Sequence, residues 1–257
     1  MNLSNATTKT TNKKFSATIL FLLISLFTLS ANLFAAEPPG RKALHDAFYN
    51  DLATTPAQYE QLFQDALQEA EKTPAGITKN VNLAWCYYLM SRICGNSGDT
   101  KRAEKLCDTA FEYADEARNK NENAETILIY TNAIAQNCTV KSFWYMMTQG
   151  IRVNGLAKDV LKHNPRCASA MYLRDAQNIY APAPFYNYKE GIKCMKAILA
   201  DPNAEFEPFD LFDVNISLAY ALINSKQKAE AAPYLAAAEK IYPYNKTLKE
   251  LKEQMNK

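Results

Sequence analysis

The chain has 257 residues, with 29 lysines and arginines against 27 acidic residues and a formal net charge of +2. Because both signs of charge are scattered along it, the sequence has no basic footprint for a nucleic acid. Only seven glycines occur, and alanine and tyrosine are abundant, which favours helices over a sheet. No C-x-x-C pair occurs among the six cysteines, so a zinc site is not expected.

The first 35 residues have the pattern of a secretory signal. Lys9, Lys13 and Lys14 precede an apolar run over residues 15–29, and Ala35 is a small residue at the expected cleavage position. The run is shorter than the roughly 20 residues of a membrane span, although an uncleaved anchor is the alternative. Cleavage would remove three lysines and no acidic residue, which changes the charge from +2 to −1. We therefore expect an exported protein, periplasmic or secreted, with no integral membrane segment after cleavage.

The mature chain would begin with a tether and a short helix. Residues 36–54 contain Pro38-Pro39-Gly40 and then a helical stretch over residues 42–52. A repeat domain follows over residues 55–257, and Thr55-Pro56 starts its first helix, with threonine as N-cap and proline at the first helical position. Apolar residues recur at helical spacing up to Thr73-Pro74, which ends that helix.

A helical hairpin is predicted over residues 84–117. Gly98-Asp99 stands where the two helices turn, because glycine accepts a positive φ and aspartate caps the next helix. Small residues at Ser91 and Ala103 allow the two helices to approach closely.

The middle of the chain has weaker signals. We expect a helix over residues 127–135, a long helix over residues 140–162, and a fourth unit that begins near residue 168 and resumes at residues 188–200. The prolines at 182 and 184 exclude a helix between these last two segments. This loop carries Phe185 and Tyr186, which could form a projecting recognition loop or, as we prefer, fold back over the end of the hairpin.

The last hairpin, over residues 212–245, has the most specific pattern. Its skeleton is Asn215, Leu218, Ala219 and Leu222, followed by Ala231, Leu235, Ala238 and Pro243. This follows the tetratricopeptide spacing W-x2-L-G-x2-Y, A-x3-F, A, P, with leucines in place of two aromatic residues. Residues 246–255 then form a polar helix that would cap the array.

On these residues the mature chain resembles an exported tetratricopeptide-repeat protein, specifically over residues 212–245 and moderately over residues 84–117. The resemblance implies an all-α, right-handed α-solenoid of about four helix hairpins with a C-terminal capping helix. The units are longer than the usual repeat of about 34 residues. This length is similar to that of the helical-repeat accessory component of TRAP-type solute transporters.

The resemblance also implies a binding surface on the concave face, which the first helix of each hairpin builds. Aromatic, arginine and amide side chains suit the recognition of a peptide or a small ligand. An equally weighted alternative for Trp85 and Tyr88 is that they cover the core of the neighbouring repeat. The repeat register assigns these residues to the concave face: Trp85, Tyr88, Arg92, Ile129, Asn132, Gln136, Arg174, Gln177, Ile216, Tyr220 and Asn224.

No signature of catalysis occurs in the sequence. It contains two histidines and lacks the H-E-x-x-H, G-x-S-x-G, P-loop and dinucleotide motifs, so we expect neither an enzyme nor a cofactor or metal. The least implausible disulfide is Cys138–Cys167, although free thiols are favoured. Asp175 would need a partner such as Arg174 if buried, and we expect it in solvent.

The function we expect is that of a non-catalytic scaffold or adaptor that holds an envelope protein or peptide in its groove. The alternative is an accessory component of an envelope transport system that binds a small, apolar molecule. A continuous aromatic and aliphatic cavity would favour this alternative.

Overall fold

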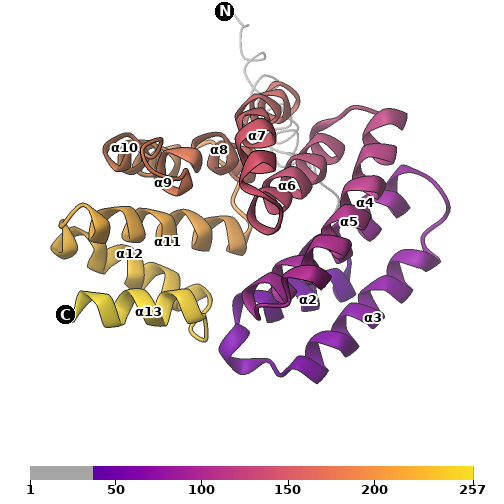
Figure 1. Ribbon diagram of the computed structural model, residues 1–257, viewed down its shortest axis with the longest axis horizontal. Helices are drawn as coiled ribbons and strands as arrows, with labels where there is room; N and C mark the ends of the chain where they lie inside the picture. Colours follow the sequence, from indigo (N-terminus) through magenta and orange to yellow (C-terminus); the bar gives the residue numbers. More distant parts are fainter. Residues whose placement is uncertain (1–36, 257) are drawn as a thin grey trace, which may run out of the picture. The chain divides into compact units, whose positions relative to one another are not determined.

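Residues 37–256 are described by a computed structural model, and the predicted signal segment at residues 1–35 lies outside them. Every regular element in the described part is a helix (Figure 1). These are α2 (Pro39–Tyr49), the 3-10 helix η1 (Asp51–Ala53), α3 (Pro56–Lys72), α4 (Ile77–Asn96), α5 (Thr100–Lys120), α6 (Ala124–Val140), α7 (Phe143–His163), α8 (Ala168–Asp175), α9 (Gln177–Tyr180), α10 (Tyr188–Ala200), α11 (Pro208–Asn224), α12 (Lys228–Ile241) and α13 (Lys246–Met255).

Several helix boundaries follow directly from local sequence. Thr55 and Gln58 form a reciprocal capping box at the start of α3, whose first residue is Pro56. Gly98 has a φ of +87° in the turn between α4 and α5, and the Asp99 side chain accepts a hydrogen bond from the Arg102 amide. These predicted boundaries are confirmed.

Two boundaries in the first half of the chain differ from expectation. The helix expected over residues 42–52 is α2, which begins at Pro39 and ends at Tyr49. Val140 ends α6 instead of starting the next helix, because Ser142 caps α7 by accepting from the Tyr145 amide.

Successive helices pack as pairs, most extensively α4 with α5, α6 with α7, and α11 with α12 (Figure 1). Fully buried small residues hold these pairs together. The hydroxyl of Ser91 donates to the Ala103 carbonyl at 2.7 Å across the α4–α5 seam, and Ala219 and Ala231 are fully buried in the α11–α12 pair. The sequence therefore identified the small residues of these two pairs correctly.

The first helix of the described part, α2, also contacts the C-terminal hairpin. The Tyr49 hydroxyl donates to Asp213 of α11 at 2.7 Å, and the Asn245 amide donates to the Tyr49 carbonyl at 2.9 Å. The Tyr49 ring stacks on Tyr242 with centroids 4.9 Å apart and meets Phe212 edge-on at 5.4 Å. In a simple repeat array each unit contacts only its neighbours. Here α2 joins the C-terminal hairpin directly, a contact that the repeat pattern did not predict.

All six cysteines are free, so the Cys138–Cys167 disulfide does not form. Four of them (Cys86, Cys94, Cys107 and Cys167) are buried, whereas Cys138 and Cys194 are half-buried. Burial raises the pKa of the Cys107 thiol to about 12, which makes it an inert core residue.

Among residues 37–256, no helix combines the length and hydropathy that crossing a bilayer requires.

Candidate functional site

A cleft of about 250 Å³ lies where α2, α4, α6, α8 and α11 converge. We call it the central cleft. Most of its walls come from the first helix of successive pairs, as a concave binding face would require. Its lining residues are His45, Tyr49, Trp85, Tyr88, Arg92, Asn132, Ala135, Gln136, Thr139, Ser169, Tyr172, Leu173, Ala176, Tyr180, Phe209, Asp210 and Asp213.

Aromatic rings form much of the wall on the side of α2 and α4. Trp85 and Tyr88 lie edge-to-face with centroids 5.4 Å apart, and the His45 ring lies 4.1 Å from that of Phe209. Trp85 also has the Arg41 guanidinium 5.5 Å from its ring centroid. These contacts fix the rings in place, so the cleft presents rigid apolar surfaces.

Arg92 is the positively charged group of the cleft. Its guanidinium lies 4.1 Å from the Phe48 ring centroid, and its Nη1 donates to the hydroxyls of Tyr49 and Tyr88, both at 3.4 Å. Burial acts to lower the pKa of Arg92, but its interactions with Tyr88, Tyr49 and Asp213 outweigh this effect, so its pKa is raised and the group stays charged.

Two carboxyl groups of α11, those of Asp210 and Asp213, also line the cleft. Asp210 is buried and accepts hydrogen bonds from the Ser169 hydroxyl and from the Glu207 amide. Burial raises its pKa to about 7. Asp213 is half-buried and accepts from Tyr49; burial raises its pKa, although Arg92 and the Tyr49 hydroxyl act in the other direction. The cleft therefore contains charges of both signs between aromatic rings.

His45 is an additional polar group of the cleft. It is 3% exposed, and its Nδ1 lies 3.1 Å from Glu37 Oε1. Within residues 37–256 no hydrogen bond engages its Nε2, and this atom is not among the fully buried atoms that lack a partner. An imidazole nitrogen can donate or accept a hydrogen bond, so Nε2 offers the cleft a polar contact for a bound molecule.

Five of the residues assigned to the concave face come together in the cleft: Trp85, Tyr88, Arg92, Asn132 and Gln136. The Tyr88 hydroxyl donates to Asn132 at 3.2 Å, which joins α4 to α6. Trp85 and Tyr88 are also buried, which agrees with the alternative that they cover the core of the neighbouring repeat. Both residues therefore line the cleft and belong to the core. Ile129 is fully buried and does not line the cleft.

The other assigned residues lie outside the cleft. Arg174 pairs with Asp175 through bonds of 3.0 and 2.6 Å, and Asp175 is buried, contrary to our expectation that it lies in solvent. Gln177 is exposed at the start of α9, and Asn224 is exposed at the end of α11. Ile216 is buried.

Tyr220 belongs to an aromatic row that leads away from the cleft. Its ring stacks on that of Tyr180, a cleft residue, at 5.7 Å and meets Tyr188 edge-on at 6.2 Å. Tyr188 in turn stacks on Tyr186 at 4.6 Å. Phe185 is 60% exposed, so this loop does not fold back over the hairpin as we had preferred.

Sequence reasoning missed the cleft residues of α2 (His45 and Tyr49), those of α8 and α9, and Phe209, Asp210 and Asp213 of α11. For α11 the helical spacing in the sequence could have identified two of these residues. Phe209 and Asp213 are four residues apart and continue the face of Ile216 and Tyr220 toward the N-terminal end. The N-terminal end of α11 lines the cleft, whereas Ile216, Tyr220 and Asn224 do not. No signal in the sequence marked α2.

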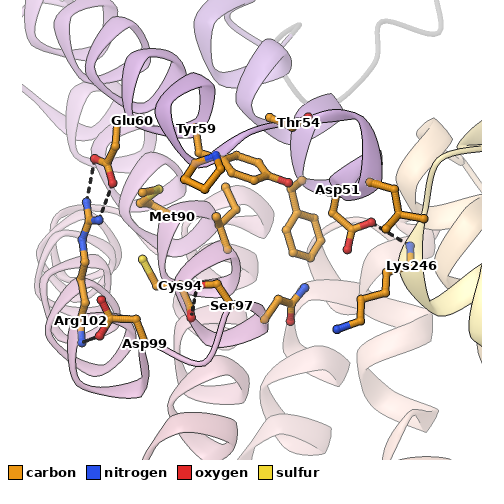
Figure 2. A pocket seen from close by; sticks show the side chains of 15 residues that line it. Asp51, Thr54, Tyr59, Glu60, Met90, Cys94, Ser97, Asp99, Arg102 and Lys246 are labelled. Carbon is orange, nitrogen blue, oxygen red and sulfur yellow. Dashed lines mark hydrogen bonds and ion pairs between the residues drawn. The ribbon is translucent and has the colours of Figure 1, made fainter.

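A second depression, the lateral groove, has a volume of about 290 Å³ and lies between α2, η1, α3, α4 and α5. Figure 2 shows Tyr59 and Met90 between two charged rims. On one rim Arg102 binds both carboxylate oxygens of Glu60. On the other, Asp51 accepts from the Lys246 amide at 2.7 Å. The groove thus combines an apolar floor with rims of mixed charge.

The sequence matches no protein-family model and no curated protein. The tetratricopeptide resemblance therefore continues to rest on the residue pattern. Among solved structures, the HusA haemophore from Porphyromonas gingivalis is similar to this chain with a TM-score of 0.46 and 16% sequence identity, over 75% of this chain and 97% of the haemophore. At this level of similarity, neither the fold nor the ligand of the haemophore can be transferred to this chain.

Proposed function

We propose that this protein is a non-catalytic, exported helical-repeat protein that binds a small molecule in the central cleft. In this proposal the helix pairs are repeats of a tetratricopeptide-like, right-handed α-solenoid, and the protein serves as an accessory component of an envelope transport system. Export is proposed from the signal pattern in residues 1–35.

The observation that carries the proposal is the convergence of His45, Trp85 and Arg92 on one cleft, each with hydrogen-bonding capacity or ring surface directed at the same space. Small-molecule sites are concave, largely apolar and equipped with a few polar groups. None of the described polar atoms that line the cleft is among the fully buried ones without a partner, so a bound molecule would take over hydrogen bonds that these groups otherwise make to water.

A substitution that fills the cleft with a larger side chain tests the proposal. Ala176 lines it and is half-buried, so Ala176→Phe should occupy the space with a ring. Ala236→Phe on the exposed face of α12 is the matched control. We expect native mass spectrometry of protein purified from the exported fraction to detect a co-purified small molecule on the wild type and on the control. We expect the Ala176→Phe variant to lack it.

The proposal is overturned if wild-type protein carries no molecule and a panel of envelope metabolites gives no thermal shift. It is also overturned if a molecule binds equally well to the Ala176→Phe variant while that variant retains its helical circular-dichroism spectrum.

The lateral groove supports a second candidate function, the binding of a peptide segment of an envelope protein. Its apolar floor would accept apolar side chains, and the rims at Glu60–Arg102 and at Asp51 offer both signs of charge to a segment of mixed charge (Figure 2). Leu52, which is 52% exposed, gives the groove an apolar anchor.

A photo-crosslinking residue in place of Leu52 tests this candidate in cells, with Gln177 as the control position. Support requires one envelope protein that crosslinks from position 52, not from position 177, and is lost on Arg102→Glu. The same products from both positions would refute the adaptor function.

A further inference from the structure

The central cleft contains one cation and one anion that its own residues leave incompletely paired. For Arg92, the hydrogen bonds within residues 37–256 use Nη1 only, and Nε and Nη2 have no partner there. No ion pair joins Arg92 to a carboxylate of the described residues. An arginine has five N–H groups and binds a carboxylate best through two parallel bonds. The unused edge of Arg92 is therefore a site for an anion.

Asp213 is the complementary group. Its Oδ2 accepts from Tyr49 at 2.7 Å, and no hydrogen bond within the described residues engages its Oδ1. Asp210 differs, because the Ser169 hydroxyl and the Glu207 amide engage both of its oxygens, and it is the N3 partner of Glu207 in the capping box of α11. Of the two aspartates, Asp213 is the one with acceptor capacity left for a bound group.

Tyr49 keeps these two charges apart. Its hydroxyl accepts from Arg92 and donates to Asp213, so it lies between them as a bridge. The ring cannot move aside to let the charges meet, because it is fixed against Phe212 and Tyr242. Separated charges in a partly desolvated site are unfavourable unless each acquires a partner. The cleft therefore presents a bound molecule with a positive group, Arg92, and a negative group, Asp213, at fixed positions.

We infer that the molecule bound in the central cleft is a small zwitterion with an apolar body, such as an aromatic amino acid or a derivative of that size. This inference rests on the proposed function. A carboxylate binds the free edge of Arg92, an ammonium group binds Asp213, and the apolar body lies against Trp85 and Phe209. The cleft volume of about 250 Å³ lies just below the range of roughly 300–1,000 Å³ found for ligand pockets, which suits a small molecule.

The test compares four related probes by isothermal titration calorimetry on the full mature chain. L-Tryptophan carries both charges, N-acetyl-L-tryptophan lacks the ammonium group, tryptamine lacks the carboxylate, and indole lacks both. We expect L-tryptophan to bind at least tenfold more tightly than each of the other three. L-Tyrosine and L-leucine, tested alongside, show which apolar body the walls prefer.

Two variants test which residue binds each charged group of the ligand. Asp213→Asn keeps an acceptor for Tyr49 but removes the negative charge, so L-tryptophan and N-acetyl-L-tryptophan should then bind within about threefold of each other. Arg92→Gln should remove the difference between L-tryptophan and tryptamine in the same way. Asp159→Asn on the exposed face of α7 is the control and should leave every ratio unchanged.

The outcomes separate this inference from the proposed function. If indole binds as tightly as L-tryptophan and Ala176→Phe suppresses both, the cleft is a small-molecule site but the zwitterion inference is wrong. If none of the three amino acids binds, or if the co-purified molecule lacks either charge, the inference is wrong, while the presence of a molecule in the cleft is decided separately by native mass spectrometry. Ratios that Asp213→Asn leaves unchanged also refute it.

Discussion

Replacing Asp210 by asparagine should remove a large pH dependence from the stability of the protein. Asp210 is 5% exposed in the first turn of α11, where burial raises the pKa of its carboxyl to about 7. The hydrogen bonds from Ser169 and the Glu207 amide act in the opposite direction but do not cancel the effect of burial. In the unfolded chain the same carboxyl has its ordinary pKa of 3.8.

The magnitude follows from the difference between these two pKa values. About three pKa units at 1.36 kcal/mol each correspond to roughly 4 kcal/mol. Since the folded-state pKa is raised, the folded protein binds the proton more tightly than the unfolded chain. The contribution to stability is therefore fully present below about pH 4 and is lost as the pH rises through about 7.

Urea denaturation at pH 5 and at pH 8 measures about two of these three pKa units, or roughly 2.7 kcal/mol, because the unfolded chain has already lost this proton at pH 5. The asparagine of the Asp210→Asn variant can still accept a hydrogen bond but does not titrate, so we expect the variant's free energy of unfolding to fall less over this interval than that of the wild type. Subtracting the two cancels the contributions of other groups, such as Glu37, whose pKa is lowered in the folded protein, despite its burial, by its bond to His45. Equal slopes for wild type and variant would refute the assignment, and Asp159→Asn controls for the loss of one charge.

Three further results are expected. Phe212→Ala should lower the free energy of unfolding by about 3–5 kcal/mol, since the ring is 2% exposed in the core, and an unchanged urea midpoint would contradict this. In the native state, a thiol reagent should modify the half-buried Cys138 and Cys194 before the other four cysteines, and peptide mapping would show any other order. Gly191→Ala should lower the melting temperature, because an added Cβ would lie 2.5 Å from Ile179 Cγ1; an equal or higher melting temperature would show that Ile179 yields freely.

The helix pairs were predictable because their signals are local. Thr55-Pro56, Gly98-Asp99 and the buried Ala219 and Ala231 each act within one helix or between adjacent helices, at separations that a repeat pattern describes. The same locality explains why Trp85, Tyr88 and Arg92, which the register grouped on one face, line the same cleft. They lie three and four residues apart on α4, so one register decision fixed all of them.

The cleft residues of α8 and α9 lie on a helix face that the repeat register did not select. Ser169, Tyr172, Ala176 and Tyr180 keep helical spacing, although α8 ends at Asp175 and α9 begins at Gln177. Arg174 belongs to a different face and pairs with Asp175. The repeat pattern of this region was weak, so the sequence did not show which of the two faces borders the cleft.

The contribution of α2 could not be predicted for a different reason. Tyr49 and Asp213 are 164 residues apart, and their contact depends on the summed geometry of all the helices between them. Yet this contact supplies the wall of the cleft that holds Arg92 and Asp213 apart. Tyr49 is at once one of the largest fully buried side chains and a lining residue of the site.

Because one residue serves both the core and the cleft, the proposed binding would be thermodynamically linked to the attachment of α2 to α11. The inferred molecule, which bridges Arg92 of α4 and Asp213 of α11, would bind only when both helices are in place beside Tyr49. At a concentration one hundred times its dissociation constant, such a molecule would add about 2.7 kcal/mol to the stability of that arrangement. This is comparable to the loss of a large buried side chain. The proposed ligand would therefore contribute as much to the contact between α2 and α11 as a large core residue does.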